Sequence, residues 1–415
     1  MSPCGAKRRS AGLSGPARLW SEANQAKARG CTLNVMLRPR VLVIFGTRPE
    51  AIKLCPVIRY FRNECDGRFD VRICVTAQHR AMLNQVLEVF QVEPHYDLNA
   101  MRPGQTLTSA TSLILSELET VLRSDRPDLV LVQGDTVSTL AGALAAFYAK
   151  IPIGHIEAGL RTGDITQPFP EEMNRVVVGR LSALHFAATP WAAANLRSEG
   201  VDARRITITG NTGIDAVLYV CKRLERNEIR GRDWSGLDPG RKLIVVTAHR
   251  RESFGRGFEQ IGAALREIAD LPDVQIVYPV HPNPNVTEPV RRHLSGHPHI
   301  WLIEPLDYIS FVDLMRRSYL LLTDSGGIQE EAPSLGKPVL VLREKTERPE
   351  AVEAGTATLV GTDVRKIVDA TKALLQNASE YERRRRIHNP YGDGMASNRI
   401  AKFILDSEQL LGAAP

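Results

Sequence analysis

Three carboxylates follow apolar, strand-like runs in the first half of the chain, or open the helix that comes next. Asp135 follows Leu129–Val132 within QGDT, Glu157 follows Ile153–Ile156 within HIEAGLRT, and Glu171 lies in PFPEEMNR. Each could be a solvated surface acid. Three acids placed in this way at strand ends nevertheless favour a functional rim, formed by the carboxyl ends of the strands. Carboxylates grouped in this way can exchange protons with a substrate or stabilise a cationic, oxocarbenium-like sugar.

Two arginines are expected on the same rim. Arg48 in FGTRPEAIK follows the apolar run Val41–Phe45, and Pro49 is placed to begin a helix. Arg175 lies one helical turn beyond Glu171, where the two side chains can pair. The rim therefore combines acids with cations.

A different kind of site is predicted where the apolar run Tyr319–Leu322 leads into TDSGGIQEEAPSLGKP. Gly326 and Gly327 have no Cβ, so an anion such as a phosphate can lie against the free N–H groups of the following helix. Ser325 can cap that helix or donate its hydroxyl. An ordinary strand-to-helix turn is the alternative interpretation.

Glu331 favours the nucleotide interpretation. It lies one turn beyond Gly327 on the same face, where a carboxylate can accept hydrogen bonds from ribose hydroxyls. In dinucleotide-binding folds the ribose acid comes from a later strand. A glutamate on the binding helix itself therefore indicates a different class of nucleotide.

Two further cationic or titratable side chains follow strands in the second half. His249, in TAHRRES, follows Lys242–Thr247 and can donate to a phosphate oxygen or move a proton, although a lone histidine can also be structural. Arg348, in TERPEA, follows Pro338–Leu342 in the same way. The second half is thus interpreted as the nucleotide-binding part of the chain, and the first half as the part that supplies acids and bases.

Strand and helix patterns alternate along the whole chain, which predicts an α/β protein with parallel sheets. KLIVVTAHRRESFGRG repeats the plan of RVLVIFGTRPEAIK, so a second Rossmann-like unit starts there. We expect two doubly wound parallel-sheet domains that face a central cleft, with ligands at the carboxyl ends of the strands. The other predicted strands are Val71–Val75, Leu184–Ala187, Arg205–Thr209, Gln275–Tyr278 and Ile300–Ile303.

The expected domain limits follow from these elements. Residues 1–37 are interpreted as a disordered N-terminal tail, 38–206 as the N-terminal domain and 207–394 as the C-terminal, nucleotide-binding domain. A final helix, 395–412, is expected to pack back on the first domain.

Composition limits the function further. The 415 residues, 43% hydrophobic and 24% charged, are typical of a soluble two-domain protein, and Lys150, His155 and Glu157 interrupt the most apolar region, so no membrane helix is expected. The net charge of +6 suits an anionic ligand. Arg383–Arg386 is interpreted as a solvated helix face and not as a nucleic-acid patch, because no aromatic residues interleave with it.

Several motifs are missing. Six cysteines include no C-x-x-C pair and no zinc spacing, so neither a metal nor a disulfide framework is implied and a reducing cytoplasm fits; Cys55, Cys74 and Cys221 are expected in the core. The absence of G-x-G-x-x-G argues against a tightly held NAD, and no P-loop supports ATP hydrolysis. The nucleotide itself is then the expected leaving group.

The motifs together resemble those of the bacterial non-hydrolysing UDP-N-acetylglucosamine 2-epimerases, over about Arg40 to Leu411. They are FGTRPEAIK, QGDT, HIEAGLRTGD, PFPEEMNR, GNTGID, HRRESFGRG, TDSGGIQEEAPSLGKPVLVLR, TERPEAV and HNPYGDG. The resemblance implies a GT-B fold, a homodimer and reversible conversion of UDP-N-acetylglucosamine to UDP-N-acetylmannosamine, without NAD or metal. It also implies elimination of UDP to 2-acetamidoglucal, re-addition of UDP, and supply of surface polysaccharide synthesis.

The resemblance also implies roles for individual residues. The expected proton carriers are Asp135, Glu157 and Glu171, with His249 near the diphosphate. The residues expected to hold UDP or the sugar are Arg48, Lys53, Arg175, Leu306, Phe311, Ser325, Gly326, Gly327, Glu331 and Arg348.

Many members of that family bind a second UDP-N-acetylglucosamine as an activator. Gln78, His79 and Gln105 match the family at that place, but Gly104 stands where some members carry an arginine. Whether this chain is activated stays open.

Three other functions remain possible on the sequence. A GT-B UDP-sugar glycosyltransferase would need an acceptor pocket and one base, and a hydrolysing 2-epimerase would release free N-acetylmannosamine. A nucleotide-sugar sensor would bind the ligand without needing the acids.

Overall fold

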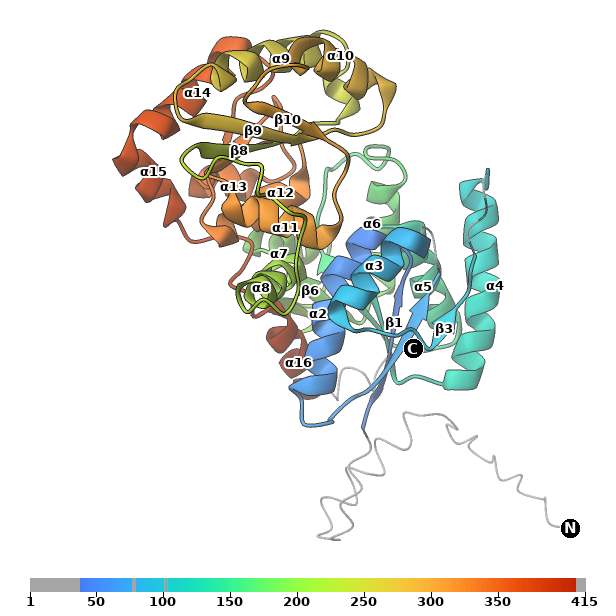
Figure 1. The fold of residues 1–415 in the computed structure, drawn as a ribbon. Coiled ribbons are helices and arrows are strands. Elements are labelled where there is room, and N and C mark those ends of the chain that lie inside the picture. The colour runs from blue at the N-terminus through green and yellow to red at the C-terminus, as the bar shows by residue number, and fades with distance from the viewer. Residues whose placement is uncertain (1–37, 77–79, 101, 103, 408–415) are drawn as a thin grey trace, which may run out of the picture.

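The computed structural model describes residues 38–76, 80–100, 102 and 104–407, which form two parallel β-sheets flanked by helices (Figure 1). The tail expected at 1–37 and the end of the helix expected at 395–412 lie outside these residues. The first sheet has the order β3-β2-β1-β4-β5-β6-β7. Its strands are β1 Arg40–Phe45, β2 Asp70–Val75, β3 Tyr96–Asp97, β4 Leu129–Gln133, β5 Ile153–Ala158, β6 Leu184–Ala187 and β7 Ile206–Ile208.

Helices connect these strands on both faces of the sheet. They are α2 Arg48–Asn63, α3 Arg80–Phe90, α4 Leu107–Asp125, α5 Val137–Tyr148, α6 Glu171–Leu181 and α7 Pro190–Ser198, with a 3₁₀ turn at Ala203–Arg205. α8, Thr212–Glu225, then leads toward the second sheet.

The second sheet has the order β10-β9-β8-β11-β12-β13. Its strands are β8 Lys242–Thr247, β9 Val274–Pro279, β10 Ile300–Ile303, β11 Leu320–Thr323, β12 Val339–Val341 and β13 Ala357–Leu359. The helices are α9 Arg256–Ala269, α10 Pro284–Leu294, α11 Tyr308–Arg317, α12 Gly326–Glu331, α13 Pro349–Ala354, α14 Val364–Gln376, α15 Ala378–Arg385 and α16 Ala396–Asp406, with 3₁₀ turns at Arg251–Ser253 and Ala332–Leu335.

The α/β class with two Rossmann-like parallel sheets is confirmed. The predicted strands are present, together with β3 and β13, which were not predicted. α12 ends at Glu331, and the chain continues as the 3₁₀ turn Ala332–Leu335, which contains Pro333.

Each sheet has one point at which the chain reverses its direction of strand addition. In the first sheet this point lies between β1 and β4, and in the second between β8 and β11, which are paired strands in both cases. Crevices at such points are where open parallel sheets bind ligands. The turns after these four strands carry Asp135, His249 and Ser325, and the helices that follow carry Arg48, Lys53, Gly326, Gly327 and Glu331.

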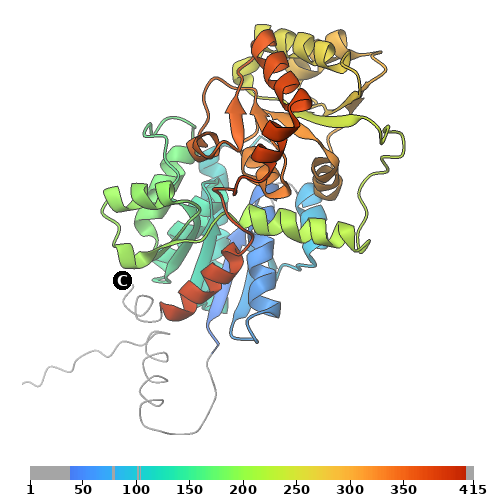
Figure 2. The same ribbon diagram turned by 90° about the vertical axis from the view of Figure 1, so that its left-hand side faces the viewer.

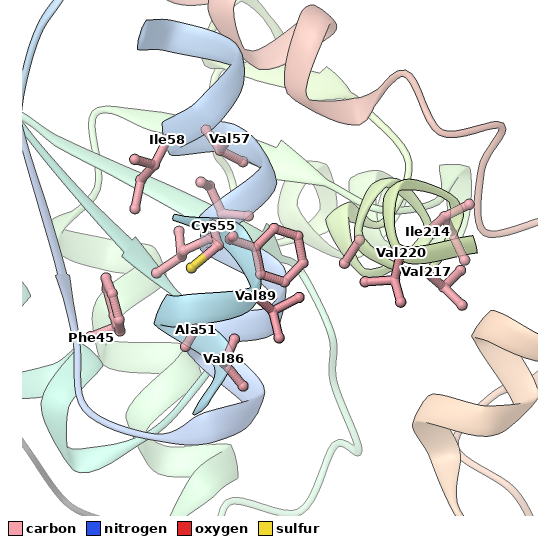
Figure 3. Close-up of a cluster of buried hydrophobic side chains, with 14 of the residues drawn as sticks. Phe45, Ala51, Cys55, Val57, Ile58, Val86, Val89, Ile214, Val217 and Val220 are labelled. Atoms are coloured by element: carbon pink, nitrogen blue, oxygen red, sulfur yellow. The ribbon is translucent and has the colours of Figure 1, made fainter. Parts of the chain in front are cut away.

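One hydrophobic cluster continues from the first domain into the second. Figure 3 shows side chains of α2 and α3 between Phe45 of β1 and the α8 residues Ile214, Val217 and Val220, and all of the labelled side chains are buried. Burial of this apolar surface holds α8 along α2, since about 25 cal/mol is gained per Å² removed from water. α8 thus packs against α2 of the first domain and also contacts α11 and α12 of the second.

α16 returns from the second domain and lies beside α2 (Figure 2). Phe403 packs edge-on against Phe186 of β6, with ring centroids 5.9 Å apart, and Ile400 and Ile404 are buried. The chain thus passes between the two sheets twice, once before α8 and once before α16.

Predictions about the arginine run and about three cysteines can also be compared with the structure. Arg383–Arg386 pair with Glu380 and Glu382 one turn away along α15, as a solvated ionic helix face does. The cysteines expected in the core are buried and unpaired. No helix within the described ranges is both long and apolar enough to cross a membrane.

Candidate active site

The turns after β1 and β4 are joined through one buried carboxylate that the sequence analysis overlooked. Glu50 closes a capping box at the start of α2, where its Oε2 accepts from the backbone N–H groups of Gly46 (3.1 Å) and Thr47 (2.7 Å). Its Oε1 accepts from the Thr136 hydroxyl at 2.7 Å. Burial raises the pKa of Glu50, and these hydrogen bonds oppose the shift. The T-x-x-E spacing was the available signal.

Glu157 lies within β5 and not after it, which corrects the prediction. The strand continues to Ala158 with a register shift between Ile156 and Ala158, and Glu157 has a φ of +63°. A bulge of this kind redirects a side chain.

The redirected carboxylate of Glu157 pairs with Lys53. Lys53 Nζ lies 2.6 Å from Oε1 and 2.7 Å from Oε2, and Gln133 also donates to Oε2. Burial disfavours the charge of Glu157, but Lys53 outweighs it and lowers the pKa of the carboxyl. Both partners are largely buried, so Glu157 is held ionised.

Asp135 has a different environment. Its Oδ2 lies 2.6 Å from Nη2 of Arg175, and Asn174 donates to its backbone oxygen at 2.7 Å. Burial raises the pKa of Asp135 to about 6, Glu157 and Glu171 add to the shift, and Arg175 opposes it. An acid with such a pKa can both give and take a proton near neutral pH.

Arg175 does not pair with Glu171, contrary to the pairing that the sequence permitted. Its other partner is Glu172, at 3.3 Å, which also accepts from the backbone N–H of Thr162 at 2.9 Å. Glu172 is buried while Glu171 is only half-buried, so the arginine turns toward the buried side of α6. Nothing in the described part of the chain bonds to the Glu171 carboxylate, which opens α6 near Asp135.

The second domain presents two histidines near an aspartate. The backbone N–H groups of His249 and Arg250 donate to Asp324 Oδ2 at 2.6 and 2.7 Å, and His249 Nδ1 lies 3.6 Å from Asp324 Oδ1. The His249 ring stacks on His281 with centroids 5.5 Å apart. Burial lowers the pKa of His249 against the opposing effect of Asp324. Asp324 and His281 were not predicted; only their positions after β11 and β9 could have indicated them.

The glycine turn after β11 lies beside Arg348. Ser325 precedes α12, but its side chain does not cap the helix, so the hydroxyl remains available. A Cβ placed on Gly326 would lie 3.7 Å from the Arg348 guanidinium carbon, which places the cation against the glycine turn. Gly327 would meet nothing within 4 Å. The turn therefore presents backbone, hydroxyl and guanidinium donors together.

Two adjacent glutamates on α12 differ in their partners. Glu330, which was not predicted, accepts from Nε of Arg348, whereas nothing in the described part of the chain bonds to the carboxyl of Glu331. Burial raises the pKa of Glu331 to about 8; Glu330 adds to the shift and Lys53 opposes it. Burial also disfavours the charge of Arg348, but Glu330 and Glu157 raise its pKa above the usual value.

The charged pairs of the two domains interact with one another. Burial opposes the charge of Lys53, but Glu157 and, from the other domain, Glu330 raise its pKa. Arg348 in turn helps to lower the pKa of Glu157. The charges of the Lys53–Glu157 pair and of the Arg348–Glu330 pair thus act on one another across the boundary between the domains.

A cavity of about 330 Å³ lies between α3 and α11. Leu306 immediately precedes one wall of it, and Phe311 is half-buried in α11. The lining includes Arg48, Val86, Val89, Asp307, Tyr308 and Ile309. Arg48, at the first position of α2, therefore lies at this cavity.

The structure describes only one of the three residues matched to an activator site. Gln78 and His79 lie outside the described residues. Gln105 donates to the Ala100 carbonyl at 3.1 Å and accepts from the Arg102 N–H at 3.0 Å, so its amide is used within its own loop. Gly104 has a φ of +74°, which an arginine would adopt only with strain. In the described ranges, no group of three or more His, Cys, Asp or Glu side chains could hold a metal ion.

Comparison with known proteins shows which proteins the chain is similar to. The profile of the family described as UDP-N-acetylglucosamine 2-epimerase matches residues 63–405. A Ralstonia solanacearum protein named as a probable UDP-N-acetylglucosamine 2-epimerase is 57% identical over 88% of this chain and 98% of its own length. The UDP-N-acetylglucosamine 2-epimerase of Escherichia coli K12 is 55% identical over the same shares.

Solved structures agree as well. UDP-GlcNAc 2-epimerase from Neisseria meningitidis, bound to UDP-GlcNAc, has a TM-score of 0.81 and 47% identity and covers 88% of this chain and 100% of its own. The Streptomyces nogalater glycosyltransferase SnogD shares the fold at 17% identity and a TM-score of 0.57, over 89% and 99% of the two chains. Fold and site thus define a GT-B protein with an acidic cluster opposite a glycine turn. The chain belongs to the UDP-N-acetylglucosamine 2-epimerase family.

The buried Lys53–Glu157 pair predicts a pH-dependent cost for Lys53→Met. The variant leaves Glu157 buried without its cation, so we expect a loss of about 3–5 kcal/mol in the free energy of unfolding. In the wild type the lowered pKa of Glu157 contributes stability above about pH 4.5, and this contribution is lost at lower pH. In the variant, burial of Glu157 is no longer opposed by Lys53, so the pKa of Glu157 rises. The free energy of unfolding then falls as pH increases above about 4.5.

Urea unfolding from about pH 5 to pH 8 measures this difference, which should widen toward pH 8. The double variant Lys53→Met/Glu157→Gln removes both charges and should recover part of the loss. Equal stability of Lys53→Met and wild type across this range would contradict the pairing.

Proposed function

We propose that the protein interconverts UDP-N-acetylglucosamine and UDP-N-acetylmannosamine at sugar carbon 2, without hydrolysis. A carboxylate takes the carbon-2 proton while the bond between carbon 1 and the UDP oxygen breaks and UDP keeps the electron pair. The intermediate is 2-acetamidoglucal. UDP then adds back at carbon 1, and a carboxylic acid returns a proton to the opposite face of carbon 2.

The observation that carries this proposal is the different state of the acids beside one crevice. Asp135, with a pKa raised to about 6 by burial, suits proton transfer. Glu157, paired with Lys53, suits the stabilisation of positive charge that develops on the sugar ring. Glu171 lies near Asp135 and has a carboxylate without a partner in the described chain, which supports it as the second proton carrier.

The second domain supplies the proposed UDP-binding site. Ser325, Gly326, Gly327 and Arg348 offer donors to the diphosphate, and His249 can donate to an oxygen of the leaving group. Glu331 is proposed to bind the ribose hydroxyls, and Leu306 and Phe311 to border the uracil. The relative that was solved with UDP-GlcNAc supports this choice of ligand.

Two broader expectations about the pathway and the oligomeric state are also proposed. The product feeds synthesis of a surface polysaccharide, and two copies of the chain form a homodimer. Both come from the resemblance to the family.

Incubation with UDP-N-acetylglucosamine alone tests the function. Proton NMR should show UDP-N-acetylmannosamine until equilibrium, and Asp135→Asn should lose turnover while still binding UDP. Free N-acetylmannosamine with UDP would indicate a hydrolysing enzyme instead. No conversion until an acceptor sugar is added would indicate a glycosyltransferase, and binding with no conversion at all would indicate a sensor.

The raised pKa of Asp135 predicts the acidic limb of the pH–rate profile. If its ionised form takes the proton, kcat rises with pH through about 6. Arg175 lowers the pKa of Asp135, so Arg175→Gln should move that limb to higher pH. Arg180→Gln, on the exposed side of the same helix, is the matched control. An unmoved limb in Arg175→Gln would remove Asp135 as the group that titrates.

A further inference from the structure

The two connections between the domains touch each other where they cross. A Cβ on Gly210 would lie 3.3 Å from both Gly392 Cα and the Tyr391 carbonyl oxygen, and the N–H of Asn211 donates to that oxygen at 2.7 Å. Gly210 and Gly392 have positive φ angles of +84° and +138°. Such a contact requires glycine on both sides, so the crossing is a defined joint and not two independent linkers.

Glu330 binds both sides of this joint. Its Oε2 accepts from Asn211 Nδ2 at 2.8 Å, and its backbone oxygen accepts from Asn389 Nδ2 at 2.7 Å. Its Oε1 accepts from Nε of Arg348. The Glu330 side chain is only 4% exposed, so these partners replace water.

The segment that follows Arg348 also contacts the first domain. α13 begins directly after Arg348, and the Glu350 carboxylate in its first turn accepts from the Thr189 hydroxyl of the first domain at 2.7 Å. Tyr391, which lies in the joint, donates its hydroxyl to the other oxygen of Glu350 at 3.1 Å. Movement of Arg348 and α13 relative to the first domain must therefore change contacts at the joint.

We propose that Glu330 is a positioning residue that holds Arg348 toward the diphosphate and ties it, through Asn211, to the joint between the domains. Binding of UDP then favours one arrangement of the domains because it fixes Arg348. This inference rests on the proposed function, since the ligand at Arg348 is the nucleotide of that reaction. Both carboxylate oxygens of Glu330 accept hydrogen bonds from protein groups, which suits a positioning role and not direct contact with the substrate.

Asn211→Asp tests the link without touching the proposed ligand site. Asn211 Oδ1 caps α8 by accepting from the Gly213 N–H at 2.8 Å, and aspartate keeps this acceptor. It replaces the donor to Glu330 by a second carboxylate, which is repulsive. We expect UDP affinity to fall about tenfold, the value of one lost charge-assisted hydrogen bond, together with a smaller change of domain arrangement on addition of UDP.

A double variant provides the rescue. In Glu330→Gln alone, the amide nitrogen faces the Asn211 donor, so this link should also be lost. In Glu330→Gln/Asn211→Asp, the glutamine can accept from Arg348 and donate to the aspartate. The double variant should therefore recover most of the UDP affinity and of the domain movement that each single variant loses.

The measurements are isothermal titration with UDP and pulsed EPR distances between spin labels at Glu119→Cys and Arg386→Cys, one exposed site in each domain. Cys4 and Cys31 are replaced by serine in this background. Asn377→Asp, which makes the same chemical change at the N-cap of α15, is the control and should behave as the wild type. Melting temperatures verify that each variant is folded.

Two results separate this inference from the proposed function. If the wild type neither binds UDP nor epimerises the substrate, the proposed function fails. If the wild type binds UDP and turns over but Asn211→Asp matches it in affinity and movement, the link alone is wrong. A folded double variant no better than either single variant would also overturn the link.

Discussion

The site depends on keeping opposite charges buried at the facing ends of two parallel sheets. Lys53 with Glu157 and Arg348 with Glu330 form one pair in each domain, and each pair raises or lowers the pKa of groups in the other. Removal of one partner from such a pair leaves a charge that the interior solvates poorly. Each domain therefore neutralises its own buried charge, and the two pairs also act on one another across the boundary between the domains.

This constraint gives neighbouring acids different tasks. The bulge in β5 turns Glu157 onto Lys53, so it stays ionised, whereas Asp135 is paired less completely and has a pKa near 6. Groups whose environments push their pKa values apart can divide charge stabilisation from proton transfer. His249 and Arg348, which are proposed to bind the leaving group, lie on the second domain, whereas Asp135 and Glu171 lie on the first.

The strand pattern predicted the sheets and the rim because apolar runs and the residues after them are local properties of the sequence. Partners from distant segments were not accessible in that way. Arg175 could reach Glu171 by spacing, but Asp135 and the buried Glu172 bind it in the fold. Likewise the spacing indicated Glu331, whereas Glu330 acquires its partners Arg348 and Asn211 only when three separate segments meet.

The central claim is that a carboxylate in this crevice removes and returns the proton at sugar carbon 2. Turnover of UDP-N-acetylglucosamine in heavy water, followed by NMR and mass spectrometry, tests it most directly. The account predicts UDP-N-acetylmannosamine that carries deuterium at carbon 2 and at no other carbon. Epimerised product that keeps its original hydrogen at carbon 2 would contradict the account.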